Sequence, residues 1–534
     1  MKKIKVFALL ATLFVGIFSN LFTPVVSADE TTATVTIHKL KNKTGPIVNT
    51  GSVLSGYTVD DFLDGITYNV YDVTAAYHAK YNEVYTSTTA QAADNTARDY
   101  VQGIAGHAPK FEGTSYVATL KDTQTTAGGG AATFTLLPKK SGGKDAVYVF
   151  VEQPKTGITA AENNLVLSFP VYKLDSEGSY TDEELTNIHL YPKNTTETIT
   201  PVKDITTPNA DAAGHNNYNV GQDIGFKLST VIPANIGITE VDSNKPYYNT
   251  FGLIDNHDTT LTFDPTGKHE LKVTNEANET VLTLTESKEN APADYTIVVG
   301  EPAPDAGKAT FKVKLTQAGI DKLATHGGKT LEFTYTMKLN ATAVMDTKNV
   351  NRVTVEYGNG DFNDVVTTPG NTTEVYTGGY RFIKTDVSTN KPLAGAEFVV
   401  RDADATTAKY LKIDDTTKEI SWVKSVTDAT IFKTGEDGIV DIKGLTYGTY
   451  YLEETKAPTD YVTLSARIKF DVKFDSYTAH TTTTPTEVKE HNVANTPKGF
   501  LPSTGGAGII LFVALGAAMV GLAGVYFTSR RKDA

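Results

Sequence analysis

The residues of greatest chemical interest are lysines, glutamates and asparagines that recur in the same order in two distant segments. A lysine amine becomes a nucleophile once it loses its proton, and a protonated carboxyl group beside an amide can polarise the amide carbonyl. Burial in an apolar core favours both neutral forms, because it lowers the pKa of a lysine and raises that of a carboxylic acid. The first set is Lys39, Glu152 and Asn194, and the second is Lys384, Glu454 and Asn495.

The sequence around each set follows one order, which indicates an internal repeat. A strand-like segment leads to the lysine, a segment with a Leu-x-Gly turn follows, and a tyrosine-containing segment carries the glutamate. The asparagine comes last, on a further strand-like segment. The matching segments are Val35–Lys39, Leu63–Val70 and Tyr148–Pro154 in one copy, and Tyr380–Lys384, Leu393–Val400 and Tyr450–Pro458 in the other.

Strands are the elements expected to position these residues. Polar and apolar residues alternate with a period of two, β-branched residues are frequent, and Gly, Asn, Asp and Pro separate the segments. This pattern predicts an all-β protein of antiparallel sandwiches with one solvated face on each sheet. The clearest alternating segments are Thr34–Lys39, Tyr148–Glu152, Glu270–Thr274, Thr310–Leu315 and Arg467–Val472.

Few other local features stand out. Helical periodicity is confined to Ala318–Ala324 and to part of Tyr77–Ala97. The glycine run of Ala127–Ala131 predicts a flexible loop, since no Gly-Lys-Ser/Thr follows to make a phosphate loop. The segment Asp255–Asp258 is expected to be a turn that ends a strand rather than a calcium site.

Composition limits the function classes. A chain of 534 residues is long enough for about three domains. Its formal net charge is −13 and it contains no cysteine. The acidic balance argues against nucleic acid and anionic lipid as partners, and disulfides and thiolate metal sites are impossible. No motif indicates a metal, a cofactor or a turnover enzyme.

Both ends of the chain carry export features. The basic start, apolar stretch and small residues of positions 1–28 predict a signal peptide removed before Asp29. At the other end, an apolar run from Gly505 to Ser529 is long enough to cross a bilayer as a helix. The basic cluster Arg530–Lys532 should remain on the cytoplasmic side. A pentapeptide precedes the run and consists of Leu501, Pro502, Ser503, Thr504 and Gly505.

The pentapeptide, the apolar run and the basic tail together resemble the cell-wall sorting signal of Gram-positive surface proteins. The resemblance implies that a sortase cysteine cleaves between Thr504 and Gly505 and transfers the Thr504 carbonyl to an amine. An ordinary single-pass anchor with a chance pentapeptide is the alternative.

The repeat resembles the CnaB-type domains of sortase-assembled pilins. Tyr450–Pro458 is similar to their E-box, whereas the first copy has Gln153 in place of the threonine after the acid. The segment between the copies resembles a CnaA-like domain. The domains expected are a signal peptide (1–28), an N-terminal CnaB-like domain (29–194), a middle CnaA-like domain (195–375), a C-terminal CnaB domain (376–500) and the sorting signal (501–534).

In this family a lysine on the first strand and an asparagine on the last form an isopeptide bond beside an acid, and ammonia leaves. The resemblance therefore assigns Glu152 and Glu454 as promoting acids for the bonds Lys39–Asn194 and Lys384–Asn495. In the middle domain it indicates Lys203, Asp255 and Asn351, with Asn349 as an alternative to Asn351. The competing interpretation is that these lysines and acids are solvated surface residues.

The segment Ile188–Lys193 resembles the pilin motif, although Glu184 replaces its tryptophan. The resemblance implies that Lys193 accepts the acyl group from Thr504 of the next subunit, which gives an open head-to-tail filament. An ordinary lysine between domains is the alternative. Asn194 can still face the core, since neighbouring strand residues point to opposite sides.

The sequence thus predicts the backbone subunit of a covalent pilus on the cell wall. Its implied partners are identical subunits, minor pilins, a pilus-specific and a housekeeping sortase, and peptidoglycan. A monomeric wall-anchored adhesin that binds a host matrix protein is the first alternative. An anchored hydrolase is the second, and no convergent nucleophile or acid pair supports it.

Overall fold

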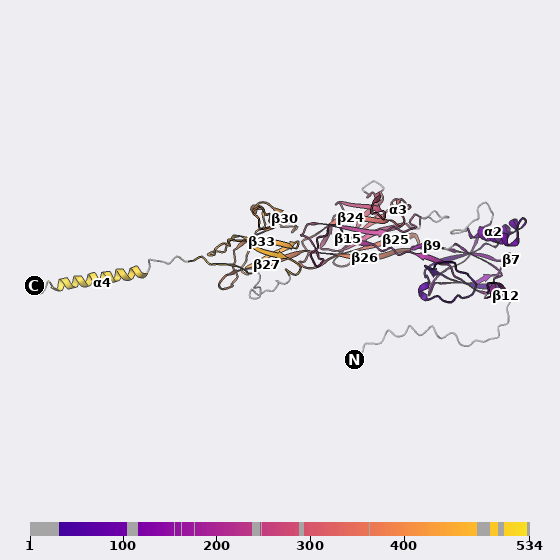
Figure 1. Ribbon diagram of the computed structural model, residues 1–534, viewed down its shortest axis with the longest axis horizontal. Coiled ribbons are helices and arrows are strands. Elements are labelled where there is room, and N and C mark those ends of the chain that lie inside the picture. Colours follow the sequence, from indigo (N-terminus) through magenta and orange to yellow (C-terminus); the bar gives the residue numbers. More distant parts are fainter. Residues whose placement is uncertain are drawn as a thin grey trace, which may run out of the picture.

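Three groups of strands follow one another along the long axis of the molecule, and helix α4 lies beyond the third (Figure 1). The computed structural model describes residues 31–103, 116–153, 155–161, 163–175, 177–237, 246, 248–287, 293–362, 364–477, 492–499 and 507–530. The predicted signal peptide and the pentapeptide Leu501–Gly505 lie outside the described residues. The described part is mostly strand, as the alternating sequence predicts.

The N-terminal domain is a sandwich with a small sheet at one end. The alternation in β1 (Thr32–His38) buries Val35 and Ile37 completely, so this strand forms the centre of the core. Its sheet also holds β5 (Ala131–Pro138) and β13 (Asn187–Leu190). The facing sheet has the order β10 (Leu165–Ser168), β8 (Val147–Glu152), β3 (Thr67–Asp72) and β4 (Thr119–Thr125). The small sheet joins β2 (Leu40–Lys41), β14 (Lys193–Thr196) and β9 (Ile158–Ala161).

The remaining elements of this domain decorate the sandwich. Two hairpins are β6 (Lys140–Ser141) with β7 (Lys144–Asp145), and β11 (Tyr172–Leu174) with β12 (Tyr180–Glu184). The short 3-10 helix η1 spans Val59–Asp61. The helical segment expected within Tyr77–Ala97 is two helices, α1 (Thr74–Tyr85) and α2 (Ala90–Gln102). The second begins at Thr89, whose side chain accepts a hydrogen bond from the Ala92 amide, as a helix cap does.

The middle domain is a larger sandwich of two six-stranded sheets. One sheet contains β15 (Val202–Ile205), β17 (Asp223–Val231), β24 (Thr330–Leu339), β20 (His269–Thr274) and β21 (Thr280–Leu284), with β19 (Leu261–Phe263) paired to β24. The other contains β16 (Asn216–Asn217), β26 (Asp364–Tyr376), β25 (Asn349–Asn359), β18 (Thr250–Asp258), β23 (Lys308–Leu315) and β22 (Tyr295–Val299).

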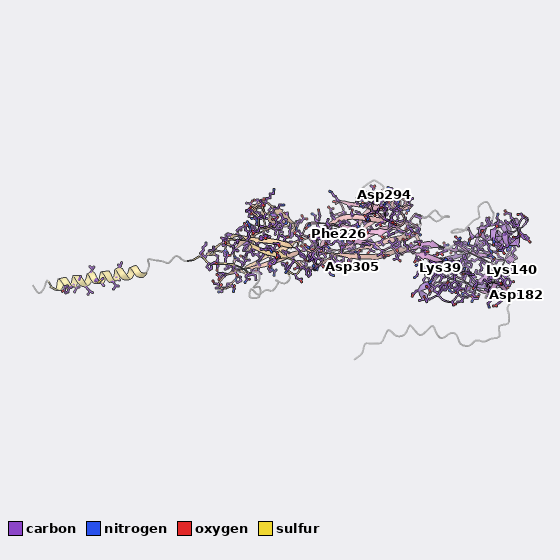
Figure 2. All side chains as sticks on the ribbon, viewed as in Figure 1. Lys39, Lys140, Asp182, Phe226, Asp294 and Asp305 are labelled. Carbon is purple, nitrogen blue, oxygen red and sulfur yellow. The ribbon has the colours of Figure 1, made fainter. Side chains whose placement is uncertain are left out.

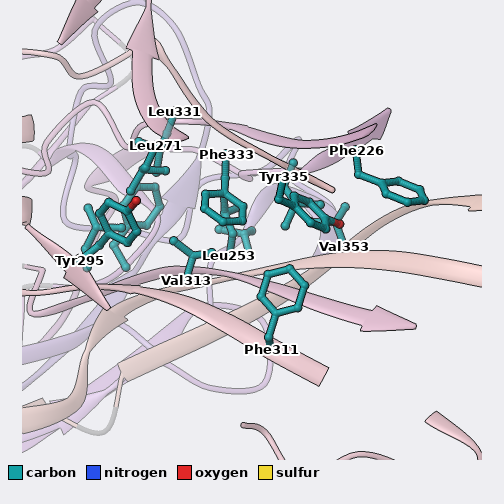
Figure 3. Close-up of a cluster of buried hydrophobic side chains, with 14 of the residues drawn as sticks. Phe226, Leu253, Leu271, Tyr295, Phe311, Val313, Leu331, Phe333, Tyr335 and Val353 are labelled. Atoms are coloured by element: carbon teal, nitrogen blue, oxygen red, sulfur yellow. The ribbon is translucent and has the colours of Figure 1, made fainter. Parts of the chain in front are cut away.

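The middle domain also corrects one prediction. Asp255–Asp258 is not a turn but the end of the nine-residue strand β18, which pairs with strands on both sides. The helix predicted at Ala318–Ala324 is α3 (Gln317–Leu323), and η2 spans Gly360–Phe362. The core between the sheets is rich in aromatic rings (Figure 3).

The C-terminal domain repeats the arrangement of the first on a smaller scale. One sheet has the order β32 (Ile439–Leu445), β27 (Gly378–Asp386) and β35 (Asn492–Asn495). The other contains β30 (Ile420–Val423), β29 (Tyr410–Ile413), β28 (Glu397–Arg401), β33 (Gly448–Lys456) and β34 (Ile468–Val472), with β31 (Phe432–Lys433) paired to β28. The 3-10 helix η3 spans Val426–Asp428.

Helix α4 (Ala507–Arg530) occupies most of the apolar run that the sequence predicts as a helix. Within the part of the chain that the structure describes, no helix meets the length and apolarity needed to cross a membrane.

Candidate crosslinking sites

The C-terminal domain brings its predicted lysine, acid and asparagine together in the core. Strands β27 and β35 run parallel and adjacent, with Lys384 opposite Val493 and Asp386 opposite Asn495. The side chains of Lys384 and Glu454 are fully buried. Lys384 Nζ lies 3.2 Å from Glu454 Oε1 and donates a hydrogen bond to Asn495 Oδ1. The Asn495 amide nitrogen in turn donates to both Glu454 oxygens, at 2.9 and 3.0 Å.

This arrangement is suited to amide exchange. The amine contacts the carbonyl side of Asn495, and the acid contacts the nitrogen that would leave. Burial lowers the pKa of Lys384, although the charge of Glu454 opposes the shift. A lowered pKa increases the fraction of neutral, nucleophilic amine. The Leu464 backbone amide donates to Glu454 Oε2 at 2.8 Å and holds the acid in place.

The N-terminal domain assembles the corresponding residues despite its divergent E-box. Lys39 is fully buried, and its Nζ donates to Glu152 Oε2 at 2.6 Å. Asn194 donates from its amide nitrogen to the other oxygen of Glu152. Its own carbonyl oxygen is buried without a hydrogen-bond partner among the described residues. The Tyr68 hydroxyl donates to Glu152 Oε2 at 2.9 Å.

The backbone around the two lysines is the same in both domains. The amide of Lys39 donates to Gly130 O at 2.8 Å, and that of Lys384 donates to Gly438 O at 2.7 Å. The carbonyl of each lysine accepts from a leucine amide, Leu63 in one domain and Leu393 in the other, at 2.9 Å in both cases. The repeat seen in the sequence is therefore a repeat of the hydrogen bonds that hold the lysine.

The two glycines have a specific role in this scaffold. Gly130 and Gly438 have positive φ angles of 70° and 69°. A Cβ atom on Gly130 would lie 2.8 Å from Lys39 O, and one on Gly438 would lie 2.5 Å from Lys384 O. The glycine run of Ala127–Ala131, expected to be only a flexible loop, thus makes the close turn that receives the Lys39 backbone.

The middle domain buries a lysine and an acid between its sheets. Lys203 is on β15 and Asp255 is on β18 of the opposite sheet, and both side chains are fully buried. Lys203 Nζ lies 2.5 Å from Asp255 Oδ2. Lys203 also donates to the Tyr335 hydroxyl at 2.6 Å, and that hydroxyl donates to the same Asp255 oxygen. His257 Nδ1 lies 2.7 Å from the other oxygen, Asp255 Oδ1.

The two candidate asparagines of this domain have different surroundings. Asn349 donates to the backbone carbonyls of Thr347 and Val375, at 3.1 and 3.0 Å. Asn351 is buried, its side-chain carbonyl oxygen has no hydrogen-bond partner among the described residues, and its amide nitrogen donates to Met337 Sδ at 3.3 Å. Asn351 is therefore the one that faces the site. It lies on β25, which is the penultimate strand rather than the last.

The charge state of the middle site differs from the expectation. Burial lowers the pKa of Lys203, against the attraction of Asp255. Burial raises the pKa of Asp255, but Lys203 and His257 outweigh it and lower the pKa to about 2. Burial thus acts on the pKa of Asp255 in the predicted direction, but the net pKa is lowered rather than raised. For the predicted crosslink, a proton would consequently have to pass from the lysine to the acid before the amine could attack.

Three residues around the middle site were missed by sequence reasoning. Tyr335 and His257 contact the reacting side chains, as described above. Asn371 stands in a glycosylation-like tripeptide that carries no weight in the sequence, yet its side chain brackets the Lys203 backbone. It accepts from the Lys203 amide at 2.6 Å and donates to the Lys203 carbonyl at 2.8 Å. No local pattern marks such residues, because strands far apart in the chain bring them together.

The predicted acceptor Lys193 lies on β14, next to Asn194. Lys193 is half-exposed and its amine donates to the Gly45 carbonyl, whereas Asn194 is buried. Two positions before it, Tyr191 is buried, and its ring stacks on His38 with centroids 4.7 Å apart. The Tyr191 hydroxyl also accepts from the Leu54 amide at 3.0 Å. The segment is thus fixed by its tyrosine while its lysine stays at the surface.

The described residues show no metal site. Within them, no group of three His, Cys, Asp or Glu side chains is arranged to hold a metal ion.

Figure 2 shows Lys39 on the side of the N-terminal domain that faces the middle domain, and Lys140 and Asp182 at the far end.

Comparison with known families matches three parts of the chain. Residues 30–195 match the model of the Gram-positive pilin subunit D1, N-terminal domain. Residues 378–487 match a prealbumin-like fold domain, and residues 495–534 match the LPXTG cell wall anchor motif.

Individual proteins give further similarities. The trypsin-resistant surface T6 protein of Streptococcus pyogenes is 34% identical over 124 residues, which are 23% of this chain and 19% of the relative. The chain thus spans about a fifth of the length of that relative. The full-length RrgB pilus protein of Streptococcus pneumoniae has a similar fold, with a TM-score of 0.56 and 19% identity. That match covers 89% of this chain and 99% of the other.

The fold and the matched domains define a class of protein. The chain carries the N-terminal domain of Gram-positive pilin subunits at residues 30–195 and an LPXTG cell wall anchor motif at residues 495–534. These matches indicate a structural pilus subunit at the cell surface, anchored to the cell wall.

Proposed function

We propose that this pilin is the backbone subunit of its pilus and is polymerised covalently. A sortase cleaves the Thr504–Gly505 bond and holds the Thr504 acyl group on its cysteine. The neutral amine of Lys193 in the next subunit attacks this acyl group, a Thr504–Lys193 amide forms and the cysteine is released. The observation that carries the proposal is the division on β14, where Lys193 is partly exposed and Asn194 is buried beside Lys39 and Glu152.

Each domain is further proposed to crosslink itself. In the N-terminal and C-terminal domains the bonds are Lys39–Asn194 and Lys384–Asn495, promoted by Glu152 and Glu454. The amine attacks the side-chain carbonyl carbon, a new amide forms, and the nitrogen of the asparagine leaves as ammonia. The contacts of each acid with both partners support this role, because such positioning replaces a bimolecular encounter.

In the middle domain the proposed bond is Lys203–Asn351, with Asp255 as the acid. The buried contacts of Lys203 and the unpaired carbonyl of Asn351 support this choice over Asn349. The proposed domains remain those of the sequence, with boundaries near residues 194, 375 and 500.

The test of polymerisation is an immunoblot of wall extracts under boiling, reducing and denaturing conditions. We expect a ladder of high-mass bands from the wild type and a single monomer band from Lys193→Ala. Lys41→Ala, on the neighbouring strand β2, is the matched control and should keep the ladder. A monomer band in the wild type would contradict the proposal and favour the singly anchored adhesin.

A further inference from the structure

One hydroxyl group in the middle domain touches both the lysine and the acid of the proposed crosslink. The Tyr335 hydroxyl accepts a hydrogen bond from Lys203 Nζ at 2.6 Å and donates one to Asp255 Oδ2. The Asn351 amide nitrogen donates to Met337 Sδ at 3.3 Å, on the strand that carries Tyr335. These residues come from strands of both sheets, so the tyrosine crosses the core at the site itself.

Its ring is held firmly by the aromatic core. Tyr335 lies with Phe226, Phe311 and Phe333 in this core (Figure 3), and ring centroids are 5.8, 5.2 and 5.3 Å from its own. Only 3% of the residue is exposed. Burial, followed by the charge of Asp255, raises the pKa of the Tyr335 hydroxyl well above its usual value, so the hydroxyl keeps a proton to donate.

We propose that Tyr335 is a catalytic residue of the Lys203–Asn351 crosslink, whose hydroxyl orients the amine and relays its proton to Asp255. The inference rests on the crosslink proposed above. Tyr335 takes one proton from the Lys203 ammonium and gives its own to the Asp255 carboxylate, which leaves a neutral amine and a neutral acid. The lone pair that this leaves on Nζ points to Tyr335, and rotation about the Cε–Nζ bond turns it towards Asn351 while the two remaining N–H bonds face Tyr335 and Asp255.

The following steps balance without a further reagent. Nζ attacks Cγ of Asn351, and a proton passes from Nζ through Asp255 to Nδ2. The Cγ–Nδ2 bond then breaks and ammonia leaves. The products are one amide, one ammonia and a protonated Asp255, while the tyrosine is regenerated.

The three domains differ in a way that makes the role testable within one molecule. In the N-terminal domain, the Tyr68 hydroxyl makes the corresponding contact with Glu152 Oε2 at 2.9 Å. In the C-terminal domain the described contact at this place on Glu454 comes from the Leu464 backbone amide. The crosslinks of the N-terminal and middle domains should therefore depend on a tyrosine hydroxyl, and that of the C-terminal domain should not.

The experiment follows crosslinking in the full chain after a timed pulse of synthesis, with samples quenched in acidic denaturant. Tryptic digestion and mass spectrometry then give the fraction of linked Lys203–Asn351 and Lys384–Asn495 peptides at each time. We expect Tyr335→Phe to slow the middle crosslink about tenfold or more, in the range of general acid–base effects. The C-terminal crosslink should form at its normal rate in the same molecules.

Tyr295→Phe is the matched control, since Tyr295 is a buried tyrosine of the same core that lies outside the site. It should change neither rate. An unchanged middle rate in Tyr335→Phe would overturn the role of the tyrosine alone. Absence of the linked peptide in the wild type would overturn the middle crosslink together with it.

Tyr68→Phe provides a second variant should Tyr335→Phe fail to fold. It is expected to slow only the Lys39–Asn194 crosslink, and a rate equal to that of the wild type would overturn the relay by a tyrosine hydroxyl.

Discussion

A lysine buried without a compensating charge is costly, and each lysine of these sites has its acid within 3.2 Å. Glu454→Ala removes the only described carboxylate partner of Lys384, and we expect two effects. The C-terminal crosslink does not form, so the ammonia of Asn495 is not lost. After correction for the substitution, the intact mass is therefore higher than that of the wild type by one ammonia. The domain loses about 3–5 kcal/mol of unfolding free energy, the typical cost of breaking a buried pair, which denaturant unfolding measures.

The neighbouring Glu453→Ala is the control for this prediction. Glu453 pairs with Arg401 and Arg467 on the outer side of the strand. Its loss should leave the mass of the crosslinked protein unchanged, apart from the substitution. Formation of the crosslink in Glu454→Ala would exclude this residue as the promoting acid.

Two neighbouring histidines predict that the stability of the N-terminal domain depends on pH. His38 Nε2 lies 2.9 Å from His189 Nδ1, and burial lowers the pKa of both rings below 6.5, with the nearby His189 adding to the shift of His38. The unfolded chain binds protons at these rings near pH 6.5, whereas the folded domain resists them. Stability is therefore complete above this pH and falls as the pH drops towards the lowered pKa values.

Thermal unfolding of the N-terminal domain between about pH 7.5 and about pH 5.5 checks this expectation, because most carboxylates titrate below that window. His189→Gln should flatten the dependence, and His326→Gln in the middle domain should not. A midpoint that rises on acidification would contradict the sign.

At the scale of elements, the proposed crosslinks depend on a strand and turn that place the lysine. Gly438 has a positive φ, and a Cβ atom there would meet the Lys384 carbonyl at 2.5 Å. Gly438→Ala should destabilise the C-terminal domain by about 1–3 kcal/mol, the range for a strained backbone position, and should slow the Lys384–Asn495 crosslink. Time-resolved mass spectrometry and denaturant unfolding measure the two effects.

Gly435→Ala is the matched control in the same turn. Gly435 has no positive φ, and a Cβ atom placed there would have only Asp437 Oδ1 near it, at 3.4 Å. The substitution should change both measurements little. Equal behaviour of the two variants would show that the close turn is not needed.

The elements also show how far sequence reasoning reaches. Alternation predicts strands such as β1 and β8, because burial on one face is a local property of the sequence. The repeated order of lysine, glutamate and asparagine leads to two sets of side chains that the structure brings together. Tyr335 could not be predicted in this way. Its position depends on a contact between two sheets, and its alternating strand is equally typical of an ordinary core tyrosine.

Contacts between distant strands also explain the two predictions about Asp255 that differ from the structure. Asp255–Asp258 contains residues that favour turns, but pairing with β23 and β25 keeps it extended. The lowered pKa of Asp255 depends on Lys203, which lies on the opposite sheet, and on His257, which lies on the same strand. The effect of these two neighbours could not be predicted before the fold was known.

At the scale of the whole molecule, contacts between domains determine whether the three sandwiches act as one rod. Asp364, at the start of β26 in the middle domain, lies 2.8 Å from Lys155 Nζ of the N-terminal domain. Its carboxylate accepts from the Thr156 amide at 2.5 Å, and its carbonyl accepts from the Thr156 hydroxyl at 2.9 Å. One residue thus holds the chain segment that follows β8 against the middle domain.

We expect Asp364→Ala to loosen this junction and to widen the distribution of distances between the two domains. The chain has no cysteine, so cysteines introduced at Asp182 and Asp305 would be its only labelling sites. Spin labels at these positions, which lie on different domains (Figure 2), report the distribution by pulsed electron resonance. Asp361→Ala is the control, because the described hydrogen bond of Asp361 comes from its backbone amide. A distribution as narrow as that of the wild type would mean that the other contacts suffice. In that case stiffness of the fibre would rest on the proposed crosslinks within domains, which would carry tension through each sandwich but would not fix the angle from one domain to the next.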